Sequence, residues 1–413
     1  MTHVLPEPAR LNAEVLIVGG GLAGLTLAAA LGTAGVPTVL VDRETRDDRM
    51  ADTFDGRTTA VALGSKRAME GAGIWPLLPD HVDQGAIRDI RVADDNAPLF
   101  LHYDHREVGD QPFGWVVENG LLRRAGFARL DALAAVTHLA PAAVAGMERD
   151  GGRIVARLSD GRTVAARLVV GADGRHSFCR NWAGIRTFGW DYPQTAIVCN
   201  VAHEFPHHGV AVEHFLPSGP FAVLPLSGDR SSIVWTERRE LAPSYMKLDE
   251  DRFARELRRR AGDWLGEMRP IGPRFAYPLH LFMAERYTDD RLALVGEAAH
   301  AIHPIAGQGL NMGLRDVAAL AEVVVDTYRL GLDVGGPDVL ARFQRWRRSD
   351  NLLLAVVTDG LNRLFSNRIG PVRLARDVGL SLVGKVPPLK RLLMRHAMGT
   401  VGRLPRLVAG DPL

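Results

Sequence analysis

The segment from Val15 to Val41 contains no charged residue, and this run constrains the fold more than any other feature of the sequence. By length alone it could span a membrane or serve as a signal sequence. It includes, however, several residues that would break a spanning helix: Gly19–Gly21, Gly32, Gly35 and Pro37. Buried parallel strands are also continuously apolar. The run therefore predicts a buried strand, a glycine turn, a buried helix and a second buried strand.

A GxGxxG motif lies at the turn of this predicted unit. Its glycines are Gly19, Gly21 and Gly24. The first glycine permits the tight turn, the second lets the backbone approach a pyrophosphate, and the third allows close helix–strand packing. The first helical residues, Leu22 and Ala23, would offer N–H groups to the phosphates. Asp42 ends the next strand and can accept hydrogen bonds from ribose hydroxyls. The pattern predicts a bound dinucleotide.

Two later motifs distinguish FAD from NAD. Asp173 lies in Gly171–Arg175 (GADGR), at the end of an apolar strand. Gly296–His300 (GEAAH) follows another short strand and continues into a glycine-bearing loop at 304–311 that opens a helix. A helix N-terminus would stabilise the negative charge of a reduced flavin, and the Glu297 carboxylate suits the ribityl hydroxyls. Each motif alone could be an ordinary turn or helix start, but the three in this order predict FAD.

Composition excludes several other classes. The net charge is +2, and no nucleic-acid reader motif is present. The two cysteines, Cys179 and Cys199, have neither a CxxC nor a Cys/His ligand spacing, so we predict no metal site and no disulfide framework. This use of cysteine is typical of a reducing cytoplasm.

The order of the elements predicts an α/β fold with two interleaved domains and a helical C-terminal region. A Rossmann-type FAD-binding domain is expected from residues 1–85, 112–183 and 288–335. A mainly antiparallel β-sheet domain for the substrate is expected from residues 86–111 and 184–287, where strand-like pieces alternate with Pro and Gly turns. Residues 336–413 are expected to be C-terminal helices. Residues 57–71 are expected to form one helix that ends at a glycine.

The three motifs together resemble those of the para-hydroxybenzoate-hydroxylase-type FAD monooxygenases over essentially the whole chain. Residues 291–316 (RLALVGEAAHAIHPIAGQGLNMGLRD) look most like the ubiquinone-biosynthesis hydroxylases, as do residues 55–60, 117–119 and 395–405. The resemblance implies further cofactor contacts. They are Arg57 and Arg123 near the adenosine or pyrophosphate, Asp173 near the pyrophosphate and ribose, and Gly307, Gly309, Leu310 and Asn311 at the isoalloxazine edge. One departure is Glu297, where the family usually has Asp.

The resemblance also implies the reaction. FAD, O2 and NAD(P)H or another electron donor would hydroxylate the aromatic ring of a polyprenylated phenol through a flavin C4a-hydroperoxide. The substrate would lie between the flavin and the antiparallel sheet, with candidate walls at Phe215, Phe221, Leu224, Pro225, Pro304 and Ile305. The sheet residues could equally be ordinary core. His303 and Pro304 are the candidates for a catalytic role, although His300 and His303 could simply shape the flavin loop.

Four other functions remain open on the sequence alone: hydroxylation of another aromatic molecule, reduction of a polyprenyl chain, flavin-dependent halogenation, and FAD binding without catalysis. The WxWxIP motif expected of a halogenase is not found in the sequence. The expected location is the cytoplasm, with a further contact to the inner face of the membrane or to a biosynthetic protein complex. Residues 390–408 (KRLLMRHAMGTVGRLPRLV) mix basic and apolar residues, as an interfacial helix does. A terminal helix packed on the body would show the same pattern.

Overall fold

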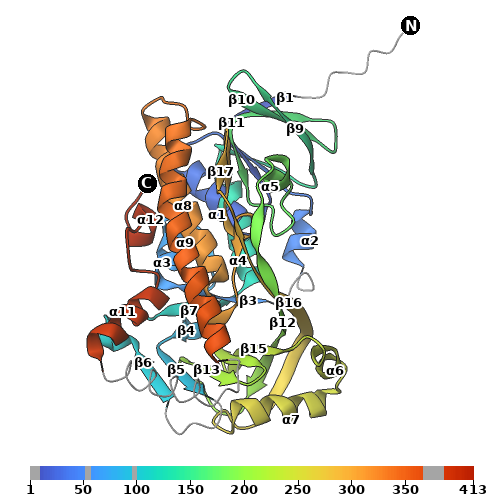
Figure 1. Ribbon diagram of the computed structural model, residues 1–413, viewed down its shortest axis with the longest axis vertical. Coiled ribbons are helices and arrows are strands. Elements are labelled where there is room, and N and C mark those ends of the chain that lie inside the picture. The colour runs from blue at the N-terminus through green and yellow to red at the C-terminus, as the bar shows by residue number, and fades with distance from the viewer. Residues whose placement is uncertain (1–9, 52–56, 95–99, 366–385) are drawn as a thin grey trace.

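The computed structural model describes residues 10–51, 57–94, 100–365 and 386–413 (Figure 1). The uncharged run folds as predicted from its strand, turn and helix signals. Strands β1 (Arg10–Val18) and β2 (Thr38–Val41) pair in parallel, and α1 (Leu22–Thr33) connects them. The last residues of both strands and nearly all of α1 are buried. This unit is the centre of the first sheet.

The first sheet has the order β17-β18-β11-β1-β2-β8 and is extended by the hairpin partners β9 and β10. Its other strands are β8 (Val136–Leu139), β9 (Val144–Asp150), β10 (Arg153–Leu158), β11 (Thr163–Gly171), β17 (Thr288–Asp289) and β18 (Leu292–Leu294). Strands β18, β11, β1, β2 and β8 are mutually parallel. Their carboxyl ends therefore meet at one edge of the sheet. Helices α4 (Asn119–Asp131) and α8 (Gln308–Arg329) pack against α1.

The second sheet has the order β19-β16-β12-β15-β14-β13-β5-β6. Its strands are β5 (Asp89–Asp94), β6 (Phe100–Asp104), β12 (Thr187–His203), β13 (Val210–Leu216), β14 (Gly219–Pro225), β15 (Arg230–Arg238), β16 (Met268–Ala284) and β19 (His300–Ala301). Neighbouring strands are antiparallel except β13 and β5. One face packs against α7 (Glu250–Ala261), which lies at the bottom of the view in Figure 1. The α/β fold class is confirmed.

A third, three-stranded sheet corrects one prediction. It contains β3 (Thr58–Ala62), β4 (Ala86–Ile87) and β7 (Gly114–Glu118). The helix expected over residues 57–71 begins only at Leu63, as α3 (Leu63–Gly71). The first part is a strand because residues 58–62 include β-branched Thr and Val side chains and pair with β7 along their whole length.

Two long helices, α8 and α9 (Pro337–Phe365), run side by side along the molecule (Figure 1). The other helices in the described part of the chain are α2 (Arg46–Met50), α5 (Phe178–Trp182), α6 (Ala242–Met246), α11 (Pro387–Ala397) and α12 (Arg406–Ala409). Short 3-10 turns occur at Trp75–Leu77, Asp80–Gly85, His105–Glu107, Gly296–Ala298 and Ile305–Gly307. No helix in the described ranges combines the length and apolar character needed to cross a membrane.

Candidate active site

The parallel register of the first sheet brings the three sequence motifs to one edge. The glycine turn follows β1, Asp42 follows β2, Asp173 follows β11, and Gly296 with Glu297 follows β18. These strands are neighbours and point the same way, so their loops lie next to one another. A ligand of an open parallel sheet binds at the carboxyl edge. Residues far apart in the sequence thus line one edge that could bind a dinucleotide.

The glycine turn has a different constraint at each glycine. Gly19 has a φ of +107°, and an added Cβ would lie 2.4 Å from the carbonyl oxygen of Ala172. At Gly24 an added Cβ would lie 1.9 Å from the carbonyl oxygen of Gly19, so the helix can approach the turn only without a side chain. Gly21 is the N-cap of α1, and nothing lies within 4 Å of its added Cβ. The open space in front of the helix N-terminus fits a pyrophosphate.

The Asp42 carboxylate is buried and already has protein partners. Arg49 donates from Nε and a terminal nitrogen at 2.7 and 2.8 Å, and the Glu44 N–H donates at 3.1 Å. Arg123 is also buried and donates from Nε to the carbonyl oxygen of Arg49 at 2.6 Å. Gly20 makes room for this carboxylate, because an added Cβ would lie 2.1 Å from Asp42 Oδ2. The predicted cofactor residues Asp42 and Arg123 are therefore brought together through Arg49.

Asp173 supplies an unsatisfied acceptor at the same edge. Its Oδ2 accepts the backbone N–H of Cys179 at 3.0 Å. Its Oδ1 is buried without a hydrogen-bond partner among the described residues. A buried carboxylate oxygen without a donor costs free energy, and a ribose hydroxyl of a bound dinucleotide would satisfy it. This observation fits FAD. Burial and the Asp173 carboxylate raise the pKa of the Cys179 thiol, which is therefore not ionised at neutral pH.

The predicted flavin loop is held on β3 through Asn311. Its side-chain amide donates to the carbonyl oxygens of Ala60 at 2.7 Å and Gly307 at 2.9 Å, and its Oδ1 accepts the N–H of Ala62 at 2.9 Å. The Asn311 side chain is thus occupied by the backbone and shapes the loop. Gly307 caps α8 with a left-handed conformation, at a φ of +60°.

Two further predicted flavin-loop residues are open to a ligand. Gly309 is exposed, with nothing within 4 Å of an added Cβ, and Glu297 is exposed in the 3-10 turn after β18. Leu310 is half-buried against the core. Arg57 is exposed, with its guanidinium 5.4 Å from the ring centre of Tyr277. Most of the predicted cofactor residues therefore lie on the turns and strand ends at this edge or at the start of α8, whereas Arg123 lies within α4 and Arg57 directly precedes β3.

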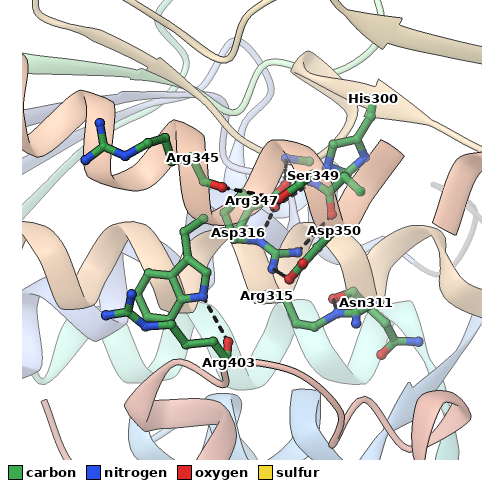
Figure 2. Close-up of polar contacts among 12 residues, drawn as sticks. His300, Asn311, Arg315, Asp316, Arg345, Arg347, Ser349, Asp350 and Arg403 are labelled. Carbon is green, nitrogen blue, oxygen red and sulfur yellow. Dashed lines mark hydrogen bonds and ion pairs between the residues drawn. The ribbon is translucent and has the colours of Figure 1, made fainter. Parts of the chain in front are cut away.

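A buried polar network, missed by the sequence analysis, connects the flavin loop to α9 (Figure 2). Its centre is Asp316 of α8, which is fully buried. Nε2 of His300 donates to Oδ2 of Asp316 at 2.5 Å, and the Gly296 N–H donates to the same oxygen at 3.3 Å. Oδ1 accepts from Nε of Arg347 and from Nδ2 of Asn351, both at 2.9 Å. Both sides of the carboxylate are therefore used.

The charge of Asp316 is stabilised by these partners. Burial alone would raise the pKa of the carboxyl, but His300, Arg347 and Asn351 hold it at about 2. Arg347 is buried and donates further to Asp350 at 2.9 Å and to Asn351 at 2.8 Å. The signal in the sequence was the charged pair Arg315 and Asp316 directly before the apolar residues 317–321, because a charge buried there requires a partner.

His303 is buried, and neither ring nitrogen has a hydrogen-bond partner among the described residues. Burial lowers its pKa to about 4, so the ring is neutral near pH 7. Tyr192 packs edge-on against it at 5.1 Å between ring centres. His300, in contrast, is bound to Asp316. His303 therefore has ring nitrogens available to a ligand, whereas Nε2 of His300 is occupied by Asp316. Pro304, the other predicted catalytic candidate, is half-buried.

The structure separates the predicted substrate walls. Phe215 lies in a small cluster with Ile305 of the flavin loop and Phe365 of α9, and its ring stacks on Phe365 at 3.9 Å between centres. Phe221 lies on the opposite face of the sheet, in the core cluster beneath α7. By the alternation of β14, Leu224 lies on the face of Phe215, and Pro225 lies on the face of Phe221.

The arrangement can hold a dinucleotide and exclude water from a ring. The open turn at Gly21, the unsatisfied Asp173 oxygen and the free helix start at Gly309 fit FAD. The cluster of Phe215, Ile305 and Phe365 places an apolar wall next to the flavin loop. The described side chains hold no activated nucleophile in this region, so the bound cofactor would have to supply the chemistry.

Comparisons with known proteins agree with this assignment. Residues 12–333 match the family described as FAD binding domain. The chain is 55% identical to ubiquinone hydroxylase UbiL of Rhodospirillum rubrum, covering 97% of this chain and 94% of that protein. It is 32% identical to 3-demethoxyubiquinol 3-hydroxylase of Escherichia coli, covering 94% and 98%. The crystal structure of p-nitrophenol 4-monooxygenase PnpA from Pseudomonas putida shares the fold. Its TM-score is 0.77 at 21% identity, covering 96% of this chain and 100% of that one.

Proposed function

The chain belongs to the FAD-binding family that contains these ubiquinone hydroxylases, and we propose that it hydroxylates the aromatic ring of a polyprenylated phenol in ubiquinone biosynthesis. The observation that carries the proposal is the 55% identity to UbiL over nearly the full length of both chains. The open turn at Gly21 and the unsatisfied Asp173 oxygen support FAD as the cofactor. Bound FAD would activate O2 and transfer one oxygen atom to the ring.

The residues of the chain would bind and orient FAD and shield the reacting ring from water. We propose that Gly19, Gly21, Leu22, Ala23 and Gly24 hold the pyrophosphate and that the Asp42–Arg49–Arg123 group holds the adenosine end. Asp173 and Glu297 would bind ribose or ribityl hydroxyls, and the start of α8 would face the isoalloxazine. The first sheet with its helices would form the FAD-binding part, and the second sheet the substrate-binding part.

The cluster of Phe215, Ile305 and Phe365 would keep water from the reacting ring. Water exclusion matters because an activated oxygen that meets water is lost as peroxide. An apolar wall also suits a prenylated phenol, whose chain gains about 0.8 kcal/mol for each CH2 removed from water. This shielding role uses only the packing of the three side chains.

We propose NAD(P)H as the hydride donor, and a cavity between the Asp173 turn and the second sheet supports this choice. The cavity has a volume of about 600 Å³ and is lined by residues that follow the Asp173 turn and by β12 and β16. Its aromatic residues include Trp190, and its charged or titratable residues are Arg175, His176, Arg180, His280 and one carboxylate, Asp191. Such a lining suits a dinucleotide with a charged pyrophosphate and flat rings.

The donor proposal is tested by charge reversal. Arg175→Glu should raise the KM for NADPH by about tenfold or more, while FAD content stays unchanged, because a charged hydrogen bond is worth roughly 1.5–3 kcal/mol. Arg255→Glu is the matched control, since Arg255 is exposed on α7, away from the cavity. An unchanged KM in Arg175→Glu would reject the cavity as the donor site.

We also propose that the protein contacts the membrane through α11. The apolar residues Leu389, Leu392 and Leu393 are exposed there, beside Arg391 and Arg395. The membrane contact predicted for residues 390–408 is thereby limited to α11, because the end of that segment packs against the rest of the protein. Leu407 and Val408 are buried, and Arg406 pairs with Glu322 and Asp326.

The membrane proposal is tested by sedimentation with vesicles of anionic phospholipid. Replacing the three exposed α11 leucines by Gln should release the protein into the supernatant with its FAD intact. Leu330→Gln with Leu332→Gln is the control, since both leucines are exposed after α8. If the control and the α11 variant sediment alike, α11 is not the contact.

The hydroxylase proposal itself is tested by mass spectrometry of quinone intermediates in cells that lack this protein. We expect a prenylated phenol without one hydroxyl to accumulate and to disappear when the wild-type gene returns. Gly21→Val should fail to restore the product, because it cannot hold FAD. An unchanged quinone pool in the deleted strain would contradict the proposal.

A further inference from the structure

Glu213 of β13 is a carboxylate within an otherwise apolar row of residues on one face of the second sheet. A row of directly paired residues crosses this face from β16 to β6: Phe275, Val198, Val234, Ala222, Glu213, Val92 and Leu101. Paired residues on neighbouring strands point to the same side of a sheet. Every member of the row except Glu213 is apolar, so its carboxylate interrupts a surface that could otherwise be simple core.

This face is the one that meets the flavin loop. Residues two apart on a strand share a face, so Glu213 lies on the same side as Phe215. Phe215 packs with Ile305, which precedes α8, and stacks on Phe365. The opposite face, with Phe221, packs under α7. Glu213 therefore points toward the side where the proposed substrate ring would lie.

The Glu213 carboxylate has no hydrogen-bonding or ion-pair partner among the residues that the structure describes. Its surroundings change its pKa through burial alone. The group lies deep among protein atoms, and yet the residue keeps partial exposure to solvent. The Glu213 side chain is therefore half-buried. Isolated buried carboxylates are costly and typically have a function.

We propose that Glu213 binds the ring hydroxyl of the phenol and takes its proton during oxygen transfer. This inference rests on the proposed hydroxylase function. The hydroxyl donates its hydrogen bond to the carboxylate. When the proton moves, a carboxylic acid and a phenolate replace a carboxylate and a phenol, and the total charge is unchanged. The ring becomes more electron-rich, which favours attack on an electrophilic oxygen.

The protonation behaviour of Glu213 suits this role. Burial raises its pKa to about 7, where a carboxyl can both accept and release a proton near neutral pH. Its neighbours on this face, Val92, Ala222 and Phe215, carry no charge. His303 is the titratable residue of the loop before α8. Its pKa is lowered to about 4, so its ring stays neutral near neutral pH, where Glu213 changes its protonation. Asp94 pairs with Phe215 through the backbone and needs its own control.

A ligand pair tests the hydrogen bond without requiring turnover. The probes are 2-farnesylphenol and its methyl ether, titrated into the oxidised holoenzyme while the flavin absorbance is followed. At about pH 8 the wild type should prefer the phenol by about tenfold or more, as expected for one charged hydrogen bond. Glu213→Leu removes the acceptor and should abolish the preference. Val92→Leu changes the shape beside it and should alter both affinities by the same factor.

The pH dependence supplies a second test if Glu213→Leu fails to retain FAD. Protonation weakens the carboxyl as an acceptor, so the wild-type preference should fall as the pH decreases from about 8 to about 6. Glu213→Gln should bind the phenol with a preference that does not vary over this range. Asp94→Asn should keep the wild-type pH dependence, and its loss there would assign the titration to Asp94 and reject Glu213.

The same experiment separates failure of this inference from failure of the hydroxylase proposal. A full phenol preference in Glu213→Leu, with FAD retained, would overturn the role of Glu213 whether or not product forms. A Glu213-dependent preference in a wild-type enzyme that forms no hydroxylated product would support Glu213 as the hydroxyl-binding residue. It would count only against the hydroxylase function.

Discussion

His300 donates a hydrogen bond of 2.5 Å to the buried carboxylate of Asp316, and this contact connects β19, which follows the turn at Gly296, to helix α8 (Figure 2). The other oxygen of Asp316 is bound by Arg347 and Asn351 of α9. One carboxylate therefore joins three segments that are separate in the sequence. We infer that it fixes the turn at Gly296 relative to the start of α8, which is where the isoalloxazine is proposed to lie.

Asp316→Asn should destabilise the protein by about 3 kcal/mol, because it leaves Arg347 buried with a weakened partner. Asp350→Asn is the matched control, since Asp350 binds the same arginine from a half-exposed position. That variant should cost no more than about 1 kcal/mol. Denaturant unfolding of both proteins measures the difference. Equal losses of unfolding free energy in the two variants would mean that the buried Asp316 contributes no more to stability than the exposed Asp350.

His303 should make the folded state sensitive to mild acid. Its pKa is about 4 in the fold, below the ordinary 6.5, so the unfolded chain binds a proton that the folded chain does not. The contribution of neutral His303 to the free energy of unfolding is fully present above about pH 6.5 and is lost as the pH falls through about 4. His303→Leu should flatten this part of the stability curve, by up to about 1.4 kcal/mol per pH unit at its steepest. His138 has a similarly lowered pKa, so part of the slope should remain. An unchanged slope in His303→Leu would show that His303 titrates normally.

Gly21→Val should fold and lose FAD. The backbone of Gly21 is extended, with a φ of −70°, which any residue can adopt, and no protein atom lies near an added Cβ. The new side chain would occupy only the space proposed for the pyrophosphate. Gly360→Val on α9 is a control with equally open surroundings. The purified proteins are compared by absorbance at the flavin bands. Stoichiometric FAD in Gly21→Val would exclude the proposed dinucleotide position.

Asp42→Ala should weaken FAD binding by about 10-fold to 100-fold, as expected for the loss of charged hydrogen bonds of roughly 1.5–3 kcal/mol. Because Arg49 binds the same carboxylate, Arg49→Ala is needed beside it. If Asp42 contacts the ribose directly, Arg49→Ala should retain more affinity than Asp42→Ala. Isothermal titration of the apoprotein with FAD provides both constants. An unchanged affinity for FAD in Asp42→Ala would mean that Asp42 does not bind the cofactor and serves only to hold Arg49.

The sequence was sufficient to predict the cofactor edge because that edge is built from local signals. Apolar runs gave the strands β1 and β2, and the glycines at 19, 21 and 24 gave the turn between them. The parallel order of strands then followed from the β-α-β pattern. The division into domains and the role of each cofactor residue remain predictions.

What the sequence could not predict depends on contacts between distant segments. Residues 58–62 form a strand because β7 pairs with them, although their own pattern favoured a helix. The two faces of the second sheet cannot be distinguished from the sequence without knowing where α7 packs, so Phe215 of β13 and Phe221 of β14 are both predicted as substrate walls although they lie on opposite faces. The partners of Asp316 and the isolation of Glu213 likewise depend on the tertiary arrangement.

The central claim is that this chain uses FAD to insert an oxygen atom from O2 into the ring of a prenylated phenol. The most direct measurement incubates the purified holoenzyme with 2-farnesylphenol, NADPH and isotopically labelled O2, and analyses the products by mass spectrometry. We predict a hydroxylated phenol that carries one labelled oxygen atom, and its absence with Gly21→Val. NADPH oxidation that yields only hydrogen peroxide, or a product whose new oxygen comes from water, would contradict the account.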